Sequence, residues 1–184
     1  MKNITIFGKG NMAKVIAERF KRAGNEVTLF GSKDEVTKLG DIIVLAVPYG
    51  AVASILEAND FAGKILVDIT NPVDFNTMDG LLVPAGSSAT EVIANLAPQA
   101  KVIKAFNTNF ASSLAGDVLT SVLLASDDTD AKVELTNALE GSNLLLIDAG
   151  SLKRAHELEA LGFLQITLAI REQITWMGGF SLTK

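Results

Sequence analysis

Cysteine is absent from the 184-residue sequence, and histidine and tyrosine each occur once. Without cysteine the chain forms neither disulfides nor thiolate metal sites, a composition that is consistent with a reducing cytoplasm. With a single histidine, His156, and no cysteine, the chain can form neither a metal cluster nor a Ser-His-Asp set. We therefore expect no bound metal, and the sequence assigns no catalytic residue.

Positive charge is also scarce, and the formal net charge is −5. Nucleic acids require a basic face, so we expect no nucleic-acid partner. The first apolar run covers only residues 4–7, and the most apolar stretch, residues 42–56, is interrupted by Pro48 and Gly50. These lengths predict neither a signal peptide nor a membrane span, and we expect a soluble, cytoplasmic protein.

Apolar runs typical of strands alternate with amphipathic stretches typical of helices. Strands are predicted at 3–7, 26–30, 42–47, 64–69, 101–106, 120–125 and 143–147, and helices at 11–23, 50–58, 88–97 and 128–139. This βαβ alternation predicts an α/β fold with a doubly wound, mostly parallel sheet of the Rossmann type over residues 1–150. Ligands of such sheets bind beyond the carboxyl ends of the strands.

Two stretches lie outside the alternation. Residues 70–87 contain prolines and glycines without clear periodicity, and we expect a loop on the substrate side there. Residues 152–177 have a continuous helical pattern, which predicts one long helix within a C-terminal part, residues 151–184. Its leucines at 158, 161, 164 and 168 form a stripe that packs either on the same domain or on a partner subunit, and the pattern leaves both open.

The most specific motif is Gly8-Lys9-Gly10-Asn11-Met12-Ala13, which joins the first predicted strand to the first predicted helix. In such a G-x-G-x-x-A turn, the first glycine permits the tight bend and the second lets the backbone approach a pyrophosphate. The helix N-terminus adds unpaired N–H groups and the positive end of its dipole. We therefore expect this turn, with Gly8 and Gly10, to bind the diphosphate of a dinucleotide.

The type of dinucleotide is indicated by the residues after the second strand. NAD enzymes place an acidic residue about 20 positions after the glycines, where it binds the ribose 2′-hydroxyl. This chain has Phe30-Gly31-Ser32-Lys33 there. Ser32 and Lys33 offer a hydroxyl and a cation that suit a 2′-phosphate, so we predict NADP. Asp34 and Glu35 fit the first turn of a short helix.

Few acid–base groups accompany the strand ends. Hydride transfer from a nicotinamide requires positioning and exclusion of water more than proton transfer, so this scarcity favours an acceptor that takes hydride directly, such as a flavin-like ring. Tyr49, after Val47 and Pro48 at a strand end, is expected to form a wall of the cofactor site. A non-catalytic sensor or regulatory module that binds NADP is the alternative from another class.

Five motifs, at residues 8–13, 31–33, 41–49, 102–108 and 147–152, resemble a known family. In this order they are similar, over nearly the whole chain, to the NADP-dependent oxidoreductases of the deazaflavin coenzyme F420 and to the related STEAP oxidoreductase domain. The resemblance implies NADP on the first turn, with Lys9, Gly10, Asn11 and Met12 around the diphosphate. It places Val47, Pro48 and Asn71 beside the nicotinamide. It also implies that Asn107 and Thr108 line the pocket of a second coenzyme, and that the tail helix forms a homodimer.

The chain departs from that family in ways that bear on these expectations. Between Lys33 and Asp41 the family has a helix, a strand and another helix, so we expect this sheet to lack an edge strand. Lys33 replaces an arginine that is common in the family, which removes a bidentate phosphate contact. The acceptor stays open between deazaflavin, FAD, FMN, ferric chelates and quinones. A weaker likeness to pyrroline-carboxylate reductases rests on residues 10–13, but those enzymes carry a helical substrate domain for which this chain is too short.

Overall fold

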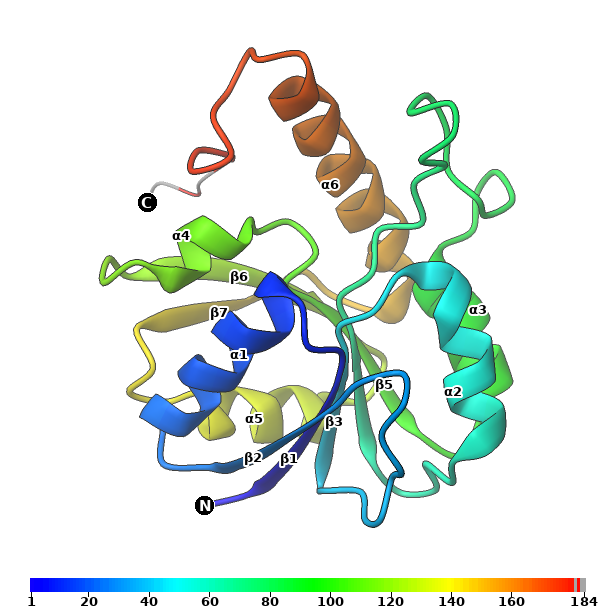
Figure 1. Cartoon of the computed structure of the whole chain (residues 1–184), viewed down its shortest axis with the longest axis vertical. Helices are drawn as coiled ribbons and strands as arrows, with labels where there is room; N and C mark the ends of the chain where they lie inside the picture. The colour runs from blue at the N-terminus through cyan, green and yellow to red at the C-terminus, as the bar shows by residue number, and fades with distance from the viewer. Residues whose placement is uncertain (181, 183–184) are drawn as a thin grey trace.

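A seven-stranded sheet covered by helices on both faces forms the centre of the molecule (Figure 1). In the computed structural model, which describes residues 1–180 and 182, the strand order is β2-β1-β3-β4-β5-β6-β7. The strands are β1 (Asn3–Phe7), β2 (Glu26–Phe30), β3 (Ile42–Leu45), β4 (Ile65–Asp68), β5 (Lys101–Ala105), β6 (Thr120–Ala125) and β7 (Leu144–Asp148). Strands β1 to β5 are parallel, whereas β6 pairs antiparallel with β5 and parallel with β7. The predicted Rossmann-type, mostly parallel sheet is confirmed.

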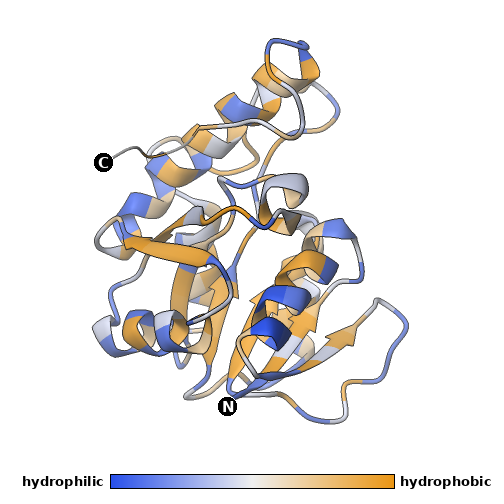
Figure 2. Cartoon of the chain, turned by 90° about the vertical axis from the view of Figure 1, so that its left-hand side faces the viewer, coloured by the Kyte–Doolittle hydropathy of each residue, from blue (hydrophilic) through white to orange (hydrophobic). Residues whose placement is uncertain are grey.

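The helices are distributed over the two faces of this sheet. They are α1 (Asn11–Arg22), α2 (Val52–Ala58), α3 (Ala89–Leu96), α4 (Ala111–Ala115), α5 (Thr129–Ala138) and α6 (Ala155–Ile170), with 3-10 turns η1 (Tyr49–Ala51) and η2 (Leu152–Arg154). In β3, Ile42 and Val44 belong to the apolar cluster that α1 and α5 complete, while Ile43 and Leu45 belong to the cluster of α2 and α3. Because both of its faces are covered, β3 is apolar along its whole length. Hydrophobic residues predominate in the strands of the sheet, as Figure 2 shows.

The chain reverses its direction of winding at β1. From β1 it crosses to β2 on one side, and all later strands follow on the other side. A crevice therefore opens at the carboxyl ends of β1 and β3, the usual ligand position in such sheets. Residues 31–41 connect β2 to β3 without a helix or strand, so β2 is the edge strand, as the short connection predicts. The short helix expected at Asp34 and Glu35 is wrong, because Asp34 instead accepts a hydrogen bond from the Gly31 N–H at 2.6 Å in a turn.

The C-terminal part differs from the single long helix predicted from the sequence. Helix α6 ends at Ile170, where Glu172 adopts φ 58° and the Gln173 N–H donates to the Leu168 carbonyl at 2.9 Å. The positive φ of Glu172 and the hydrogen bond from Gln173 to Leu168 end the helix in a Schellman-type cap. No glycine or proline in the sequence marks this end. The following residues, 171–180, turn back toward α4 (Figure 1).

The buried face of α6 also differs from the expected leucine stripe. Leu158 is buried, but Leu164 is 50% exposed, and the buried face contains Glu159, Gly162 and Gln165. The helix therefore meets the sheet through polar and small residues, for which partners are described below.

The predicted irregular loop at residues 70–87 is confirmed, apart from an isolated bridge between Val73 and Leu81. Among the described residues, no helix is both long and apolar enough to cross a membrane.

Candidate functional site

The turn between β1 and α1 has the geometry that a diphosphate requires. Gly8 has φ 120°, and a Cβ there would overlap the carbonyl oxygen of Ala46 on the neighbouring strand. A Cβ at Gly10, in contrast, would meet no atom within 4 Å. Gly10 is also the N-cap of α1 and provides no side-chain hydrogen bond to the first N–H groups of the helix. The turn is thus open on the side where these N–H groups can bind an anion.

At the end of β2, the side chains expected to bind a 2′-phosphate are accessible. Ser32 and Lys33 are both exposed. Two residues later lies an acidic side chain, Asp34, whose carboxylate forms an ion pair with Lys9 at 2.6 Å. The hydrogen bond from Lys9, and a second from the Gly31 N–H, hold the pKa of Asp34 below its usual range. The charge of Asp34 is therefore already paired with a residue of the glycine turn.

The end of β3 supplies the third part of the crevice. Val47 and Tyr49 are half-buried and Pro48 is exposed. Burial, together with the negative charges of Glu159 and Asp68, raises the pKa of the Tyr49 phenol above its ordinary value of 10.0. Tyr49 thus keeps its proton at neutral pH.

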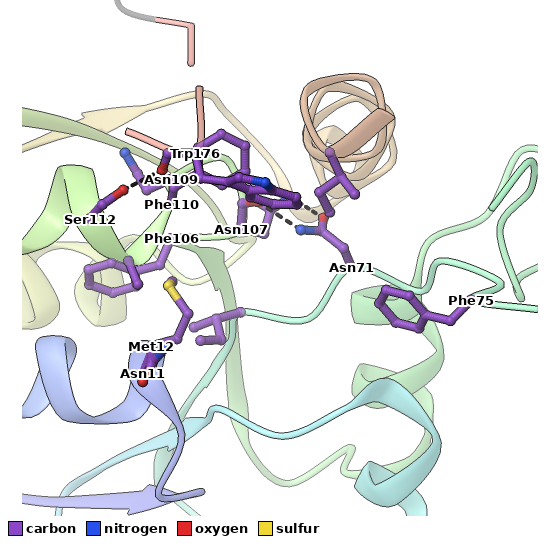
Figure 3. A pocket seen from close by; sticks show the side chains of 13 residues that line it. Asn11, Met12, Asn71, Phe75, Phe106, Asn107, Asn109, Phe110, Ser112 and Trp176 are labelled. Atoms are coloured by element: carbon purple, nitrogen blue, oxygen red, sulfur yellow. Dashed lines mark hydrogen bonds between the residues drawn. The ribbon is translucent and has the colours of Figure 1, made fainter. Parts of the chain in front are cut away.

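A cavity of about 540 Å³ lies beside the β1–α1 turn, at the carboxyl ends of β4 and β5 (Figure 3). Its aromatic walls are Phe75, Phe106, Phe110 and Trp176, and its amide side chains are Asn11, Asn71, Asn107 and Asn109. None of the described residues that line it carries a charge. The size is that of a small-molecule site, and the lining suits a flat, apolar ring with a few polar edge atoms.

Two asparagines at the base of this cavity hold each other in place. The Asn71 Nδ2 donates to the Asn107 backbone carbonyl, and the Asn107 Nδ2 donates to the Asn71 Oδ1, both at 2.9 Å. Helix α6 packs directly on this pair at Gly162, where a Cβ would lie 2.5 Å from the Asn71 Oδ1. Only glycine permits this close approach, so α6 packs against the Asn71–Asn107 pair and helps to hold it in position.

A buried cluster of charges attaches α6 to the strand ends. Lys104 on β5 contacts Asp68 at the end of β4 at 2.9 Å and Glu159 on α6 at 2.8 Å, and all three side chains are at most 1% exposed. Glu159 also accepts hydrogen bonds from the backbone N–H groups of Ala89 and Thr90 at the start of α3. The N-terminus of α3 therefore stabilises the negative charge of Glu159, which Lys104 shares with Asp68.

Several known proteins are similar to this chain in sequence and in fold. Residues 27–72 match the family described as NADP oxidoreductase, coenzyme F420-dependent. The chain is 29% identical to the F420-dependent NADP reductase of Methanocaldococcus jannaschii, over 86% of this chain and 76% of that protein. It is 30% identical to the rat metalloreductase STEAP3, over 86% of this chain but only 36% of that longer protein.

A solved structure of a proposed F420-dependent NADP reductase from an Arthrobacter species is similar over the full length of both chains, with a TM-score of 0.83 and 25% identity. This chain is similar to the coenzyme F420-dependent NADP oxidoreductases. The predicted resemblance, and the predicted class of an NADP-dependent oxidoreductase enzyme, are confirmed at the level of this family.

The predicted site residues all lie at the carboxyl edge of the sheet, but they form two groups. Asn11, Met12, Asn71 and Asn107 line the aromatic cavity. The remaining predicted residues do not line it and lie at the ends of β1, β2, β3 and β5: Gly8, Lys9, Gly10, Ser32, Lys33, Val47, Pro48, Tyr49 and Thr108. Thr108 is buried, and its carbonyl accepts a hydrogen bond from Gln165 of α6.

Reasoning from the sequence missed the aromatic walls and the buried charges. Asp68 lies within the strand predicted at 64–69, but its full burial at the end of β4 was not predicted. A lysine within the apolar strand Lys101–Ala105 was the available signal, because a buried lysine needs an acidic partner. Phe110 and Trp176 gave no such signal, since 66 positions separate them along the chain. In the described residues, no group of three or more His, Cys, Asp or Glu side chains has the arrangement of a metal site.

Proposed function

We propose that this protein is an NADPH-dependent reductase that passes hydride to a flavin-like or deazaflavin ring bound in the aromatic cavity. The observation that carries the proposal is the continuity of the two parts of the site. Asn11 and Met12 belong to the glycine turn at the start of α1 and also line the aromatic cavity. A dinucleotide on the turn and a ring in the cavity would therefore be neighbours.

Each part of the cofactor would contact a different group of residues around the turn. Gly8 to Met12 would hold the diphosphate through backbone N–H groups, and Ser32 and Lys33 would hold the 2′-phosphate. Val47, Pro48, Tyr49 and Asn71 would flank the nicotinamide, and Asn107 and Thr108 would lie on the acceptor side. Since Asp34 is paired with Lys9, it would compete little for the ribose hydroxyl that NAD enzymes bind through a free acid.

The chain's own contribution to the reaction is positioning and exclusion of water. When bound, NADPH supplies a hydride that reduces the acceptor by two electrons, and water supplies the accompanying proton. The aromatic walls keep the acceptor ring flat and shield it from solvent, and the Asn71–Asn107 pair fixes the floor on which it rests. No side chain needs to act as an acid or base in this scheme.

An acceptor screen tests the proposal. Stopped-flow absorbance at the NADPH band would follow oxidation in the presence of deazaflavin, FMN, FAD, ferric citrate or a quinone. We expect rapid oxidation with flavins or deazaflavin. Tight NADPH binding without oxidation by any acceptor would contradict the proposal and favour a sensor. Oxidation by ferric citrate alone would contradict the ring-binding role of the cavity.

We also propose that the protein acts in the cytoplasm as a homodimer formed through residues 151–184, the C-terminal part predicted from the sequence. Support comes from exposed apolar side chains on this part, including Leu164 at 50%, Ile170 at 42% and Met177 at 77% exposure. Light scattering after gel filtration should give twice the chain mass, and Leu164→Glu should give a monomer. A monomeric wild-type protein at micromolar concentration would contradict this part of the proposal.

A further inference from the structure

We propose that a buried triad of net negative charge, Asp68, Lys104 and Glu159, favours the oxidised form of the bound nicotinamide and so makes NADPH a stronger hydride donor. Hydride transfer takes two electrons and one proton from the nicotinamide C4, passes them to the acceptor and leaves the ring with a positive charge. The inference rests on the proposed function, because it concerns the same cofactor. It does not depend on which acceptor receives the hydride.

The hydrogen bonds of the triad define its charge. The Nζ of Lys104 donates to one oxygen of Asp68 at 2.9 Å and to one oxygen of Glu159 at 2.8 Å. Its third proton is donated to the Thr70 carbonyl at 2.5 Å, so Lys104 is an ammonium ion with every donor used. The remaining carboxylate oxygens accept from the backbone N–H groups of Thr70 and Ala89, both at 2.8 Å. Two carboxylates and one ammonium ion give the triad a net charge of about −1.

This charge is retained inside the protein. All three side chains are at most 1% exposed, so dissolved ions screen them little. The N–H groups at the start of α3 offset part of the charge, but a helix N-terminus is equivalent to only about half a unit charge. Within the part of the chain that the structure describes, Lys104 is the only cation that forms an ion pair with Asp68 or Glu159. A negative field therefore remains at this position.

The triad lies behind the strand ends that would flank the nicotinamide. In the parallel pairing of β3 with β4, Asp68 lies opposite the last residue of β3, and Val47 follows two residues later. On the β4 side, the backbone N–H and carbonyl of Thr70 are both bonded to the triad, and Asn71 is the next residue. The proposed nicotinamide site is therefore connected to the triad from both strands.

Tyr49 indicates that the field extends to the end of β3. Burial, together with the negative charges of Glu159 and Asp68, raises the pKa of its phenol. A cationic ring beside the same strand end would be stabilised by these charges, whereas the uncharged reduced ring would not. At an effective dielectric constant of about 20, a unit charge changes an equilibrium about tenfold across about 12 Å.

The two nucleotide affinities are linked to the reduction potential of the bound cofactor. If a field strengthens binding of NADP⁺ tenfold relative to NADPH, the potential of the bound two-electron couple falls by about 30 mV. A lower potential means that the bound NADPH transfers its hydride more readily. The triad would thus act on the cofactor without touching the acceptor.

The experiment measures the Kd of NADP⁺ and of NADPH by isothermal titration calorimetry in the wild type, Glu159→Gln and Asp68→Asn. Each variant removes one carboxylate charge and leaves Lys104 paired with the other carboxylate, so the buried group becomes neutral. We expect either variant to raise the ratio of the NADP⁺ Kd to the NADPH Kd about tenfold. Glu157→Gln is the matched control, because it removes an exposed carboxylate of the same helix and should leave the ratio unchanged.

A third ligand separates an electrostatic role from a structural one. The fragment 2′,5′-ADP lacks the nicotinamide, and we expect all four proteins to bind it equally. Circular dichroism verifies that the variants are folded. If Glu159→Gln and Asp68→Asn weaken 2′,5′-ADP, NADP⁺ and NADPH by the same factor, the triad only supports the shape of the site and the inference is overturned.

The remaining outcomes are also decisive. An unchanged ratio in both variants, or a ratio that falls, would overturn the inference and leave the proposed reductase intact. If the wild type binds neither NADP⁺ nor NADPH, the proposed function itself fails. The wild-type titrations therefore distinguish the two failures.

Discussion

The glycine turn and the aromatic cavity lie side by side but are built in opposite ways. The turn consists of consecutive residues, Gly8 to Met12, and needs only the neighbouring strand at Ala46 to complete it. The cavity is assembled from segments between Asn11 and Trp176, and its floor is fixed by α6 through Gly162 and the buried charges. Backbone geometry thus defines the cofactor side, whereas long-range side-chain packing defines the acceptor side. Changes on the two sides should therefore have different consequences.

The largest effect is expected where the acceptor side depends on buried charge. Lys104→Met leaves the carboxylates of Asp68 and Glu159 buried without their cation, and should lower the free energy of unfolding by about 3–5 kcal/mol. Urea unfolding followed by circular dichroism measures this loss. Lys21→Met is the matched control, because its ion pair with Glu18 is exposed, and it should change stability by less than about 1 kcal/mol. Equal unfolding midpoints for the two variants would show that the buried triad contributes no more than a surface pair.

Two alanine substitutions separate folding from binding on the cofactor side. Gly8→Ala forces a side chain onto positive φ and against Ala46, and should cost at least about 1–3 kcal/mol of stability. Gly10→Ala meets no protein atom, so it should leave stability unchanged but weaken NADPH binding about tenfold or more, because the methyl group occupies the diphosphate's approach. Thermal unfolding and NADPH fluorescence titration measure the two properties. If Gly10→Ala bound NADPH as well as the wild type, the turn would not be the diphosphate site.

A smaller effect, confined to the cofactor side, is expected from Lys33→Ala. Loss of a charge-assisted contact to the 2′-phosphate should weaken NADPH binding about 10- to 100-fold and leave NADH binding unchanged. Lys38→Ala, an exposed lysine of the same connection, controls for the general loss of positive charge. Parallel titrations with both nucleotides give the comparison. Unchanged NADPH affinity in Lys33→Ala, or an equal loss for NADH, would remove Lys33 from the site.

The smallest effect is expected from Asp34→Asn, which frees Lys9 and removes a carboxylate near the 2′-phosphate. NADPH affinity should rise, by about fivefold at most, because the ion pair is solvated. The lowered pKa of Asp34 means that the wild-type pair persists above the ordinary value of 3.8 and is lost only as the pH falls through the lower folded value. Asp34 is thus ionised at neutral pH, and the gain should be constant between pH 7 and 8, where the 2′-phosphate is also largely doubly charged, when measured by titration. A fall in NADPH affinity would indicate that Asp34 positions Lys9 productively.

The sequence by itself determined the features that depend on neighbours along the chain. The structure contains the predicted alternation of strands and helices and the G-x-G-x-x-A turn. It also lacks an additional edge strand between Lys33 and Asp41, as predicted. Each is a local property, since hydrophobic periodicity and the steric freedom of glycine act over a few residues.

Only the tertiary structure decided how α6 ends and what it contacts. The cap at Glu172 is local but has no glycine to mark it, whereas the return of Trp176 to Phe110 and the ion pairs of Lys104 join residues far apart in the chain. The leucine stripe predicted an apolar interface, but the buried face of the helix includes Glu159, because the strand ends present Lys104 to it. Such contacts are selected by the packing of the whole chain, which the periodicity of one segment does not encode.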